Sequence, residues 1–398
     1  MQYLADELKF DFLTTPQIIF GIGRFKEIGD ILTNYGKRIL VVGSKSAFSD
    51  IKDNFESLIT KKKMNYDLHY ITGEPDIQQI DDGVALGLKQ KVDIVLGIGG
   101  GSAVDAGKAI AGLITNGGSA KDYMEIIGKG SKIRKESIPY IAIPTTAGTG
   151  SEVTKNAVIS SKEDGLKASI RSSFLIPKIA LIDPKLMVNV SPEVTAYCGL
   201  DALTQLIESY TSIKAQPITD SLAILGIRRI TKSLIYVCEN GQDISAREDV
   251  AFAALLSGIC LANAGLGAVH GFASPIGGML GIPHGVVCGA LLAHVVEENI
   301  KQMVAEIPFN ETLAKYATLG ELIANLVFDD IREAADRVIE YTEQISRLLK
   351  VPKLSKYGLT DKHFEKIIEK AKKSSSMRYN PVRLSDEALY RILLKSVQ

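Results

Sequence analysis

One aspartate and two histidines in the second half of the chain have the chemistry of metal ligands. Asp201 lies in the segment GLDALTQLIESY (199–210), and His270 and His284 lie in NAGLGAVHGFASPIGGMLGIPHG (263–285). The glycines and prolines between the two histidines are expected to break any continuous helix, so that the imidazoles converge from different elements. Such a triad can hold Zn²⁺ or Fe²⁺ and leave a position open for a substrate oxygen. The alternative is that each histidine is a hydrogen-bonded structural residue.

A glycine-rich turn in the first half is typical of a phosphate-binding site. The sequence DIVLGIGGGSAVDAGKAIAG (93–112) predicts a buried strand, a turn and a helix that begins near Ser102. Because Gly99, Gly100 and Gly101 have no Cβ, their backbone can approach a ligand closely. Ser102 is expected to cap the helix, whose N-terminus offers free N–H groups and partial positive charge to a diphosphate. A plain capped helix after a tight turn is the alternative.

Hydroxyl groups are dense in the segment IPTTAGTGSEVTKNAV (143–158), which follows an apolar strand. The carboxyl ends of strands form the edge where open α/β sheets bind ligands. A loop that satisfies its own backbone would explain one or two of these hydroxyls, but less easily five. The candidate donors to ribose or phosphate are Thr145, Thr146, Thr149, Ser151 and Thr154.

These residues need two kinds of architecture to position them. Apolar runs closed by Gly, Pro or Asp alternate with helix-like segments such as 51–63 and 77–90, which predicts a parallel sheet with helices on both faces. The predicted strands are 38–43, 93–100, 140–146 and 178–184. Beyond Asp183-Pro184, apolar residues recur at helical spacing near 193–212, 217–238, 246–264, 286–303, 329–349 and 361–373. We therefore expect an α/β dinucleotide-binding domain (1–185), an all-α domain (186–398) and a site between them.

Composition indicates an ordinary folded enzyme. The 398 residues are 46% apolar and 23% charged, with a formal net charge of zero, which gives no reason to expect nucleic acid or an anionic membrane as a partner. The start, MQYLADELKFDF, does not have the pattern of a secretory signal, and no apolar run is long enough for a membrane span. The four cysteines form no CxxC pair and are expected to be reduced, buried thiols and not metal ligands. A cytoplasmic location follows as an expectation.

Together the segments closely resemble the iron-containing (group III) alcohol dehydrogenase family, in order and separation as well as in residue type. The matching pieces are FGIG (20–23), GIGGGSAVDAGKAIA (97–111), PTTAGTGSEVT (144–154), IDP (182–184), GLDALTQLIESY and GAVHGFASPIGG…IPHG. The resemblance spans nearly the whole chain. It implies a homo-oligomeric enzyme that transfers a hydride between NAD(P)(H) and a small alcohol or aldehyde, assisted by a divalent metal.

The resemblance also assigns roles to residues. It implies that the diphosphate is held by Gly100, Gly101 and Ser102. It implies that the ribose and nicotinamide are lined by Thr145, Thr146, Thr154 and Lys167. Three of the family's four metal-ligand positions are Asp201, His270 and His284.

Two positions depart from the family pattern. Gln205 stands where the family has its fourth ligand, a histidine, and a glutamine oxygen is a weaker ligand for Zn²⁺ or Fe²⁺. The site then binds metal through three ligands plus Gln205 or water, or has abandoned metal; we favour a bound metal. Ser274 replaces a histidine that lies near the nicotinamide in relatives, which puts proton relay by that route in doubt.

The end of the strand at 38–43 favours NADP(H) over NAD(H). Dinucleotide folds that prefer NAD often place a carboxylate after the second strand, where it binds the ribose 2′-hydroxyl. Here Gly43, Ser44 and Lys45 occupy that region, so nothing acidic repels a 2′-phosphate.

Three alternatives remain. A metal-independent reductase of oxo-acids, of the maleylacetate reductase type, shares the fold and needs a cationic pocket, to which Lys155 and Arg171 are candidates. A lyase of the 3-dehydroquinate synthase type would use NAD without net oxidation or reduction. A nucleotide-binding scaffold without catalysis is the third, although a scaffold does not require three convergent ligands.

Overall fold

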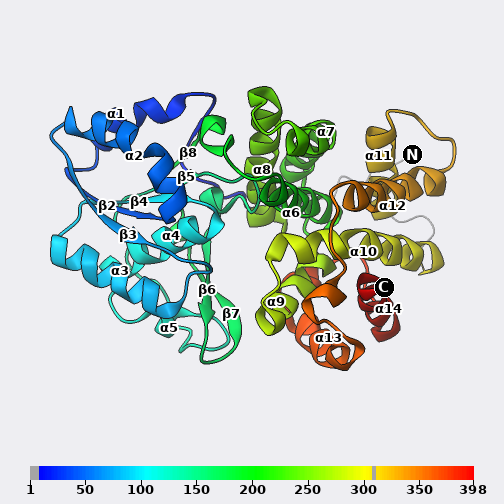
Figure 1. The fold of residues 1–398 in the computed structure, drawn as a ribbon. Coiled ribbons are helices and arrows are strands. Elements are labelled where there is room, and N and C mark those ends of the chain that lie inside the picture. Colours follow the sequence, from blue (N-terminus) through cyan, green and yellow to red (C-terminus); the bar gives the residue numbers. More distant parts are fainter. Residues whose placement is uncertain (1–8, 307–310) are drawn as a thin grey trace.

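The first part of the chain forms a parallel sheet (Figure 1). The structure is a computed structural model that describes residues 9–306 and 311–398. Within these residues the main sheet has six strands in the order β1-β8-β5-β4-β2-β3, all parallel to their neighbours. The strands are β1 (Gln17–Phe20), β2 (Arg38–Gly43), β3 (Asn65–Tyr70), β4 (Ile94–Gly99), β5 (Tyr140–Pro144) and β8 (Ile179–Ile182). The α/β prediction for this part is confirmed.

Helices cover both faces of this sheet, which is why its inner strands are apolar along almost their whole length. Ile39 and Val41 of β2 face one helical layer, and Leu40 and Val42 face the other. The first layer contains α1 (Ile28–Leu32) and α2 (Lys45–Thr60). The second contains α3 (Ile77–Gln90) and α4 (Gly101–Asn116), and the short α5 (Ala120–Tyr123) follows.

Two edge strands and a hairpin were not predicted. β3 has the polar sequence NYDLHY and is only partly buried at the edge of the sheet, so it lacks the apolar signal of the inner strands. β1 has four residues and pairs with β8, far along the chain. A separate antiparallel hairpin consists of β6 (Asn156–Ser161) and β7 (Leu166–Arg171), directly after the hydroxyl-rich segment.

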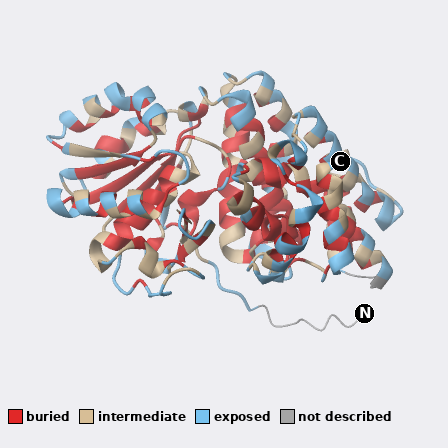
Figure 2. Cartoon of the chain, turned by 60° about the horizontal axis from the view of Figure 1, so that its bottom comes forward, coloured by how far each residue is buried: buried red, intermediate tan, exposed pale blue. Residues whose placement is uncertain are grey.

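The second part is helical and has its own buried interior (Figure 2). Its helices are α6 (Pro192–Thr211), α7 (Pro217–Glu239), α8 (Ile244–Ala264), α9 (Ala268–Leu280), α10 (His284–Glu306), α11 (Glu311–Ala324), α12 (Ile331–Leu348), α13 (Phe364–Lys373) and α14 (Asp386–Val397). All six predicted helices are present with small shifts at their ends; α9, α11 and α14 were not predicted. The all-α prediction for this part is confirmed.

One local expectation is confirmed and another was wrong. The expected break between the two histidines is present at Gly281, which has a left-handed conformation, and Pro283, although α9 runs through Pro275. The two histidines therefore come from different helices. Helix α4 begins at Gly101 with Gly100 as its N-cap, so Ser102 lies inside the first turn and does not cap it.

The expected division at residue 185 stays a prediction; β8 ends at Ile182 and α6 begins at Pro192. In the described part of the chain, no single helix is long and apolar enough to cross a membrane. Helices α8 and α9 reach the required length and apolar content only when taken together, and they meet at a bend of 100°. Residues 1–8, which form most of the start compared with a secretory signal, lie outside the described residues.

Candidate active site

The predicted cofactor residues gather at the carboxyl edge of β2, β4 and β5. Gly43 ends β2, and the Ser44 hydroxyl caps α2 by accepting a hydrogen bond from Ala47 N at 3.3 Å. Gly99 ends β4, and its carbonyl accepts a 2.8 Å hydrogen bond from Thr145 N. β2 and β4 are neighbours in the sheet. From β2 the chain continues to β3 on one side of this pair, and from β4 it continues to β5 on the other side, so the strand order reverses between β2 and β4. Open α/β sheets bind ligands at such a reversal of strand order.

Gly100 and Gly101 lie where the loop after β5 contacts the start of α4. A Cβ at Gly100 would lie 3.3 Å from Thr146 Oγ1, and one at Gly101 would lie 2.8 Å from Thr149 Oγ1. Side chains at these two positions would therefore collide with the threonines of that loop. Because α4 is 16 residues long and its N-cap glycine has no side chain, its first N–H groups suit a diphosphate.

Thr154 is brought to the same loop, but its hydroxyl points into a buried network. Its Oγ1 lies 3.0 Å from Lys108 Nζ, and Lys108 is completely buried. The same ammonium donates to Ser151 O at 2.8 Å and Asn156 O at 2.7 Å. Burial lowers the pKa of Lys108, and the nearby carboxylate of Asp105 opposes that effect. The role of Thr154 in cofactor binding stays a prediction.

Lys167 lies on β7, which contacts α9 of the helical part. Its ammonium forms a 2.9 Å ion pair with Glu74, and its side chain is 19% exposed. A Cβ at Gly277 of α9 would lie 3.9 Å from Lys167 Nζ. The hairpin therefore places this lysine beside α9, the helix that also contains His270.

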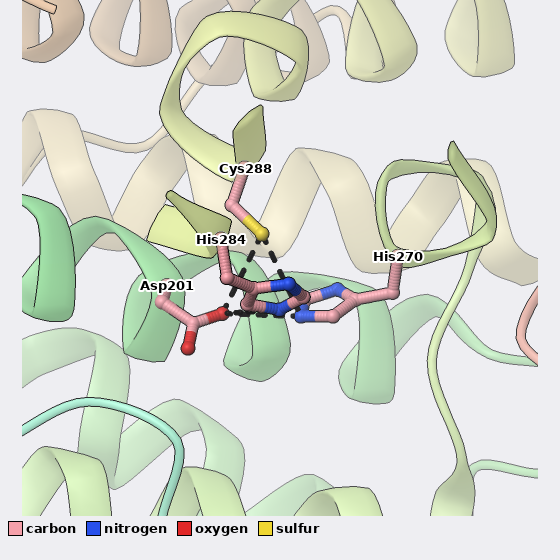
Figure 3. A group of neighbouring side chains, drawn as sticks. All are labelled: Asp201, His270, His284 and Cys288. Atoms are coloured by element: carbon pink, nitrogen blue, oxygen red, sulfur yellow. Dashed lines mark hydrogen bonds and ion pairs between the residues drawn. The ribbon is translucent and has the colours of Figure 1, made fainter. Parts of the chain in front are cut away.

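Asp201, His270 and His284 converge from α6, α9 and α10 (Figure 3). Asp201 Oδ1 lies 3.1 Å from His270 Nε2 and 3.5 Å from His284 Nε2. Cys288 joins them, with its Sγ 3.5 Å from Asp201 Oδ1 and 3.8 Å from His270 Nε2. The four donor atoms all lie within 4.8 Å of one another. Carboxylate, imidazole and thiol in one cluster are a donor set that fits a divalent metal.

Cys288 is the member of this cluster that was not expected, since the cysteines were predicted to be reduced, buried thiols and not metal ligands. Its spacing from His284 is four residues on α10, so both side chains lie on one face of the helix. That spacing was a usable signal in the sequence. Gln205 instead accepts a 3.0 Å hydrogen bond from the Ser257 hydroxyl of α8. Its role as a metal ligand stays a prediction.

Glu208, one turn beyond Gln205 on α6, fixes the orientation of His270. Its Oε2 lies 2.6 Å from His270 Nδ1, and its Oε1 accepts a 2.6 Å hydrogen bond from Val269 N. A carboxylate on Nδ1 holds the ring so that Nε2 points to Asp201 with its lone pair free for a metal. A Cβ at Gly267 would lie 2.9 Å from Glu208 Oε1, so a larger residue there would displace this carboxylate.

The electrostatics of the cluster favour positive charge. Burial lowers the pKa of His270, but attraction to Cys288 and the hydrogen bond to Asp201 outweigh it and raise that pKa well above its usual value. Burial raises the pKa of Asp201, yet its two histidine partners lower it below the usual value overall. A bound metal ion supplies such positive charge in place of a proton.

The cofactor edge and the metal cluster are joined by direct packing. A Cβ at Gly148 would lie 3.0 Å from Cys198 Cβ, one turn before Asp201 on α6. The Ser257 hydroxyl that contacts Gln205 also lies 3.4 Å from Gly148 O. Thus the loop after β5 contacts the helix that holds the aspartate.

Comparison with known proteins agrees with this architecture. The model of the family "Iron-containing alcohol dehydrogenase" matches residues 15–184, and that of "Fe-containing alcohol dehydrogenase family, C-terminal" matches residues 195–397. Alcohol dehydrogenase 4 of Saccharomyces cerevisiae is 34% identical over 97% of this chain and 98% of its own length. The 1,3-propanediol dehydrogenase of Klebsiella pneumoniae is 31% identical over 96% and 97% of the two chains.

A solved structure of a 1,3-propanediol oxidoreductase has the same fold. It superposes with a TM-score of 0.90 at 30% identity and covers 98% of this chain and 100% of its own. The chain belongs to the iron-containing alcohol dehydrogenase family. It is an oxidoreductase that transfers a hydride between a nicotinamide dinucleotide and a small alcohol or aldehyde.

Proposed function

We propose that this alcohol dehydrogenase uses NADP(H) together with a divalent metal ion held by Asp201, His270 and His284. The observation that carries the metal assignment is the convergence of these donor atoms from three helices, beside the loop that follows β5. A bound divalent ion would supply Lewis-acid polarisation of the substrate oxygen. The protein would then hold alcohol and nicotinamide in near-attack geometry.

The residues around the cluster divide the remaining tasks. Asp201, His270 and Cys288 are buried, which keeps water from most of the site, whereas the side chain of His284 is 38% exposed. A substrate can therefore enter on the side of His284. Glu208 would hold His270 in one orientation through its 2.6 Å contact with Nδ1.

The preference for NADP(H) rests on the end of β2. Lys45 is the exposed first residue of α2, and the first turn of that helix contains no acidic residue. A 2′-phosphate bound beside Gly43 and Ser44 would meet a cation and no carboxylate. NAD(H) would lack the partner that a carboxylate provides there.

The test is oxidation of NADPH and of NADH with a panel of short aldehydes and oxo-acids. Protein is assayed as purified, after chelation, and after addition of Fe²⁺ or Zn²⁺. We expect aldehyde reduction with NADPH that chelation abolishes and metal restores. His270→Ala should lower turnover by orders of magnitude and leave NADPH affinity nearly intact, because His270 lies away from the sheet edge.

Other outcomes would overturn parts of the proposal. Oxo-acid reduction by protein that elemental analysis shows to be free of metal would indicate a reductase of the maleylacetate type. Equal loss of turnover and of NADPH affinity in His270→Ala would contradict the separation of the two sites. A cytoplasmic location and a homo-oligomeric state stay predictions from the sequence.

A further inference from the structure

We propose that Cys288 is the fourth protein ligand of the metal, so that the site is an Asp–His–His–Cys zinc centre that would become five-coordinate when the substrate oxygen binds. This inference rests on the proposed metal-assisted function and specifies which ion and which ligands it uses. Asp201, His270, His284 and Cys288 come from three helices of one packed core, and two of them lie on adjacent turns of α10.

The distances within the cluster match a tetrahedral zinc site. Zinc–nitrogen and zinc–oxygen bonds of about 2.0–2.1 Å and a zinc–sulfur bond of about 2.3 Å give tetrahedral edges of about 3.3 Å between nitrogen and oxygen and about 3.5 Å to sulfur. The observed edges from Asp201 Oδ1 to the two imidazoles are 3.1 and 3.5 Å. The edges from Cys288 Sγ are 3.5 Å to Asp201 and 3.8 Å to His270. The two sulfur distances are therefore close to those expected for a ligand at one corner of such a site.

Gln205 is the other candidate for the fourth ligand position, and it is the weaker one. The amide oxygen of Gln205 lies 3.0 Å from the Ser257 hydroxyl on α8, and a neutral amide is a weaker ligand than a thiolate. Cys288 is completely buried and its sulfur contacts two of the other ligands. The thiol that resembles it most in burial, Cys260, instead contacts Thr219 O at 3.5 Å.

A thiolate changes the metal that the site selects. Thiolate ligands favour Zn²⁺, and Fe²⁺ binds more weakly than Zn²⁺ to nearly any set of nitrogen, oxygen and sulfur donors. Asp201 and a Cys288 thiolate together balance the two positive charges of the ion. We therefore expect the purified protein to contain Zn²⁺ and to retain it when Fe²⁺ is added in moderate excess.

The first experiment uses the wild-type protein, so that folding of a variant does not enter. X-ray absorption at the zinc edge of protein loaded with one equivalent of Zn²⁺ should show one sulfur neighbour at about 2.3 Å beside nitrogen and oxygen neighbours at about 2.0–2.1 Å. A shell of nitrogen and oxygen alone would overturn the assignment of Cys288 while leaving a metal-assisted function intact. Failure to bind any divalent ion would overturn the proposed metal role, and this inference with it.

The second experiment identifies the sulfur. Protein loaded with Co²⁺ should show a near-ultraviolet sulfur-to-cobalt charge-transfer band, which Cys288→Ser abolishes and the matched control Cys260→Ser retains. Zinc affinity, measured by competition with a chromogenic chelator, should fall at least about tenfold in Cys288→Ser, since even loss of a hydrogen-bond partner of a ligand costs that much. A band that survives in folded Cys288→Ser would overturn the proposal.

Discussion

Glu208 shows at the scale of one residue how this site is held. Both of its oxygens are used, one by His270 Nδ1 and one by the backbone N–H of Val269, each at 2.6 Å. The Glu208 carboxylate thus positions both the imidazole ring of His270 and the backbone at the start of α9. Because Glu208 and His270 are 62 residues apart in sequence, only the tertiary structure, which brings the first turn of α9 to Glu208 of α6, creates this pair.

Glu208→Gln should weaken metal binding by about 10- to 100-fold. A glutamine has one acceptor oxygen, so either the His270 ring or Val269 N would face its NH₂ group, which donates. The measurement is zinc affinity by chelator competition. Glu298→Gln is the control, because Glu298 is also buried but binds Arg391. Equal zinc affinity in both variants and the wild type would show that Glu208 does not position the ligand.

At the scale of elements, α8 joins the two parts of the molecule by packing directly on the loop after β5. Gly150 has a left-handed conformation, and a Cβ at Gly258 would lie 2.2 Å from its carbonyl oxygen. Val153 of the same loop packs with Ala251 and Leu255 of α8 in a small apolar core. The close approach sets the distance between the cofactor edge and the metal cluster.

Gly258→Ala should destabilise the protein by about 1–3 kcal/mol, because backbone and not a flexible side chain occupies the space of the new methyl group. Gly278→Ala in α9 is the matched control. Its nearest neighbour would be 3.7 Å away, so removing a helical glycine should be neutral or stabilising. The comparison is made from urea unfolding midpoints. Equal shifts of both midpoints would contradict the close-packing argument.

At the scale of the whole molecule, the region between the two parts contains an unusual carboxyl group. Glu152 is buried, and burial raises its pKa to about 7, although Lys108 opposes the shift. In the unfolded chain the same group has its ordinary pKa of 4.5. Between these two values the folded protein keeps a proton that the unfolded chain has lost. Stability therefore falls as pH rises from 4.5 to 7 and loses nothing further from this group above 7.

Glu152→Gln should remove this loss, which amounts to about 3 kcal/mol at most. The free energy of unfolding of both proteins is measured at pH 5 and pH 8. Other groups titrate equally in the two proteins, so the wild type should lose more stability across this interval than the variant. Parallel changes would show that Glu152 is ionised in the folded protein at pH 5.

Local pattern was enough to predict much of the molecule. Apolar runs such as the one at 38–43 matched β2 to the residue, because a strand buried on both faces must be apolar throughout. Apolar residues at helical spacing in 217–238 predicted α7, because a helix that packs on one face must repeat its apolar residues every three to four positions. The partly polar edge strand β3 and the short β1 were missed, since half-exposed or short strands have no such signal.

The sequence by itself determined the inner strands, most of the longer helices, the glycine-rich turn and three residues of the Asp–His–His–Cys cluster, because these depend on residue type and short spacing. Only the tertiary structure decided that Cys288 joins them. Its contact with Asp201 spans 87 residues and results from the packing of α10 on α6. The contact between Gln205 and Ser257 of α8, which are 52 residues apart in sequence, was decided in the same way. Contacts of this kind depend on how helices pack, which no periodicity within one segment encodes.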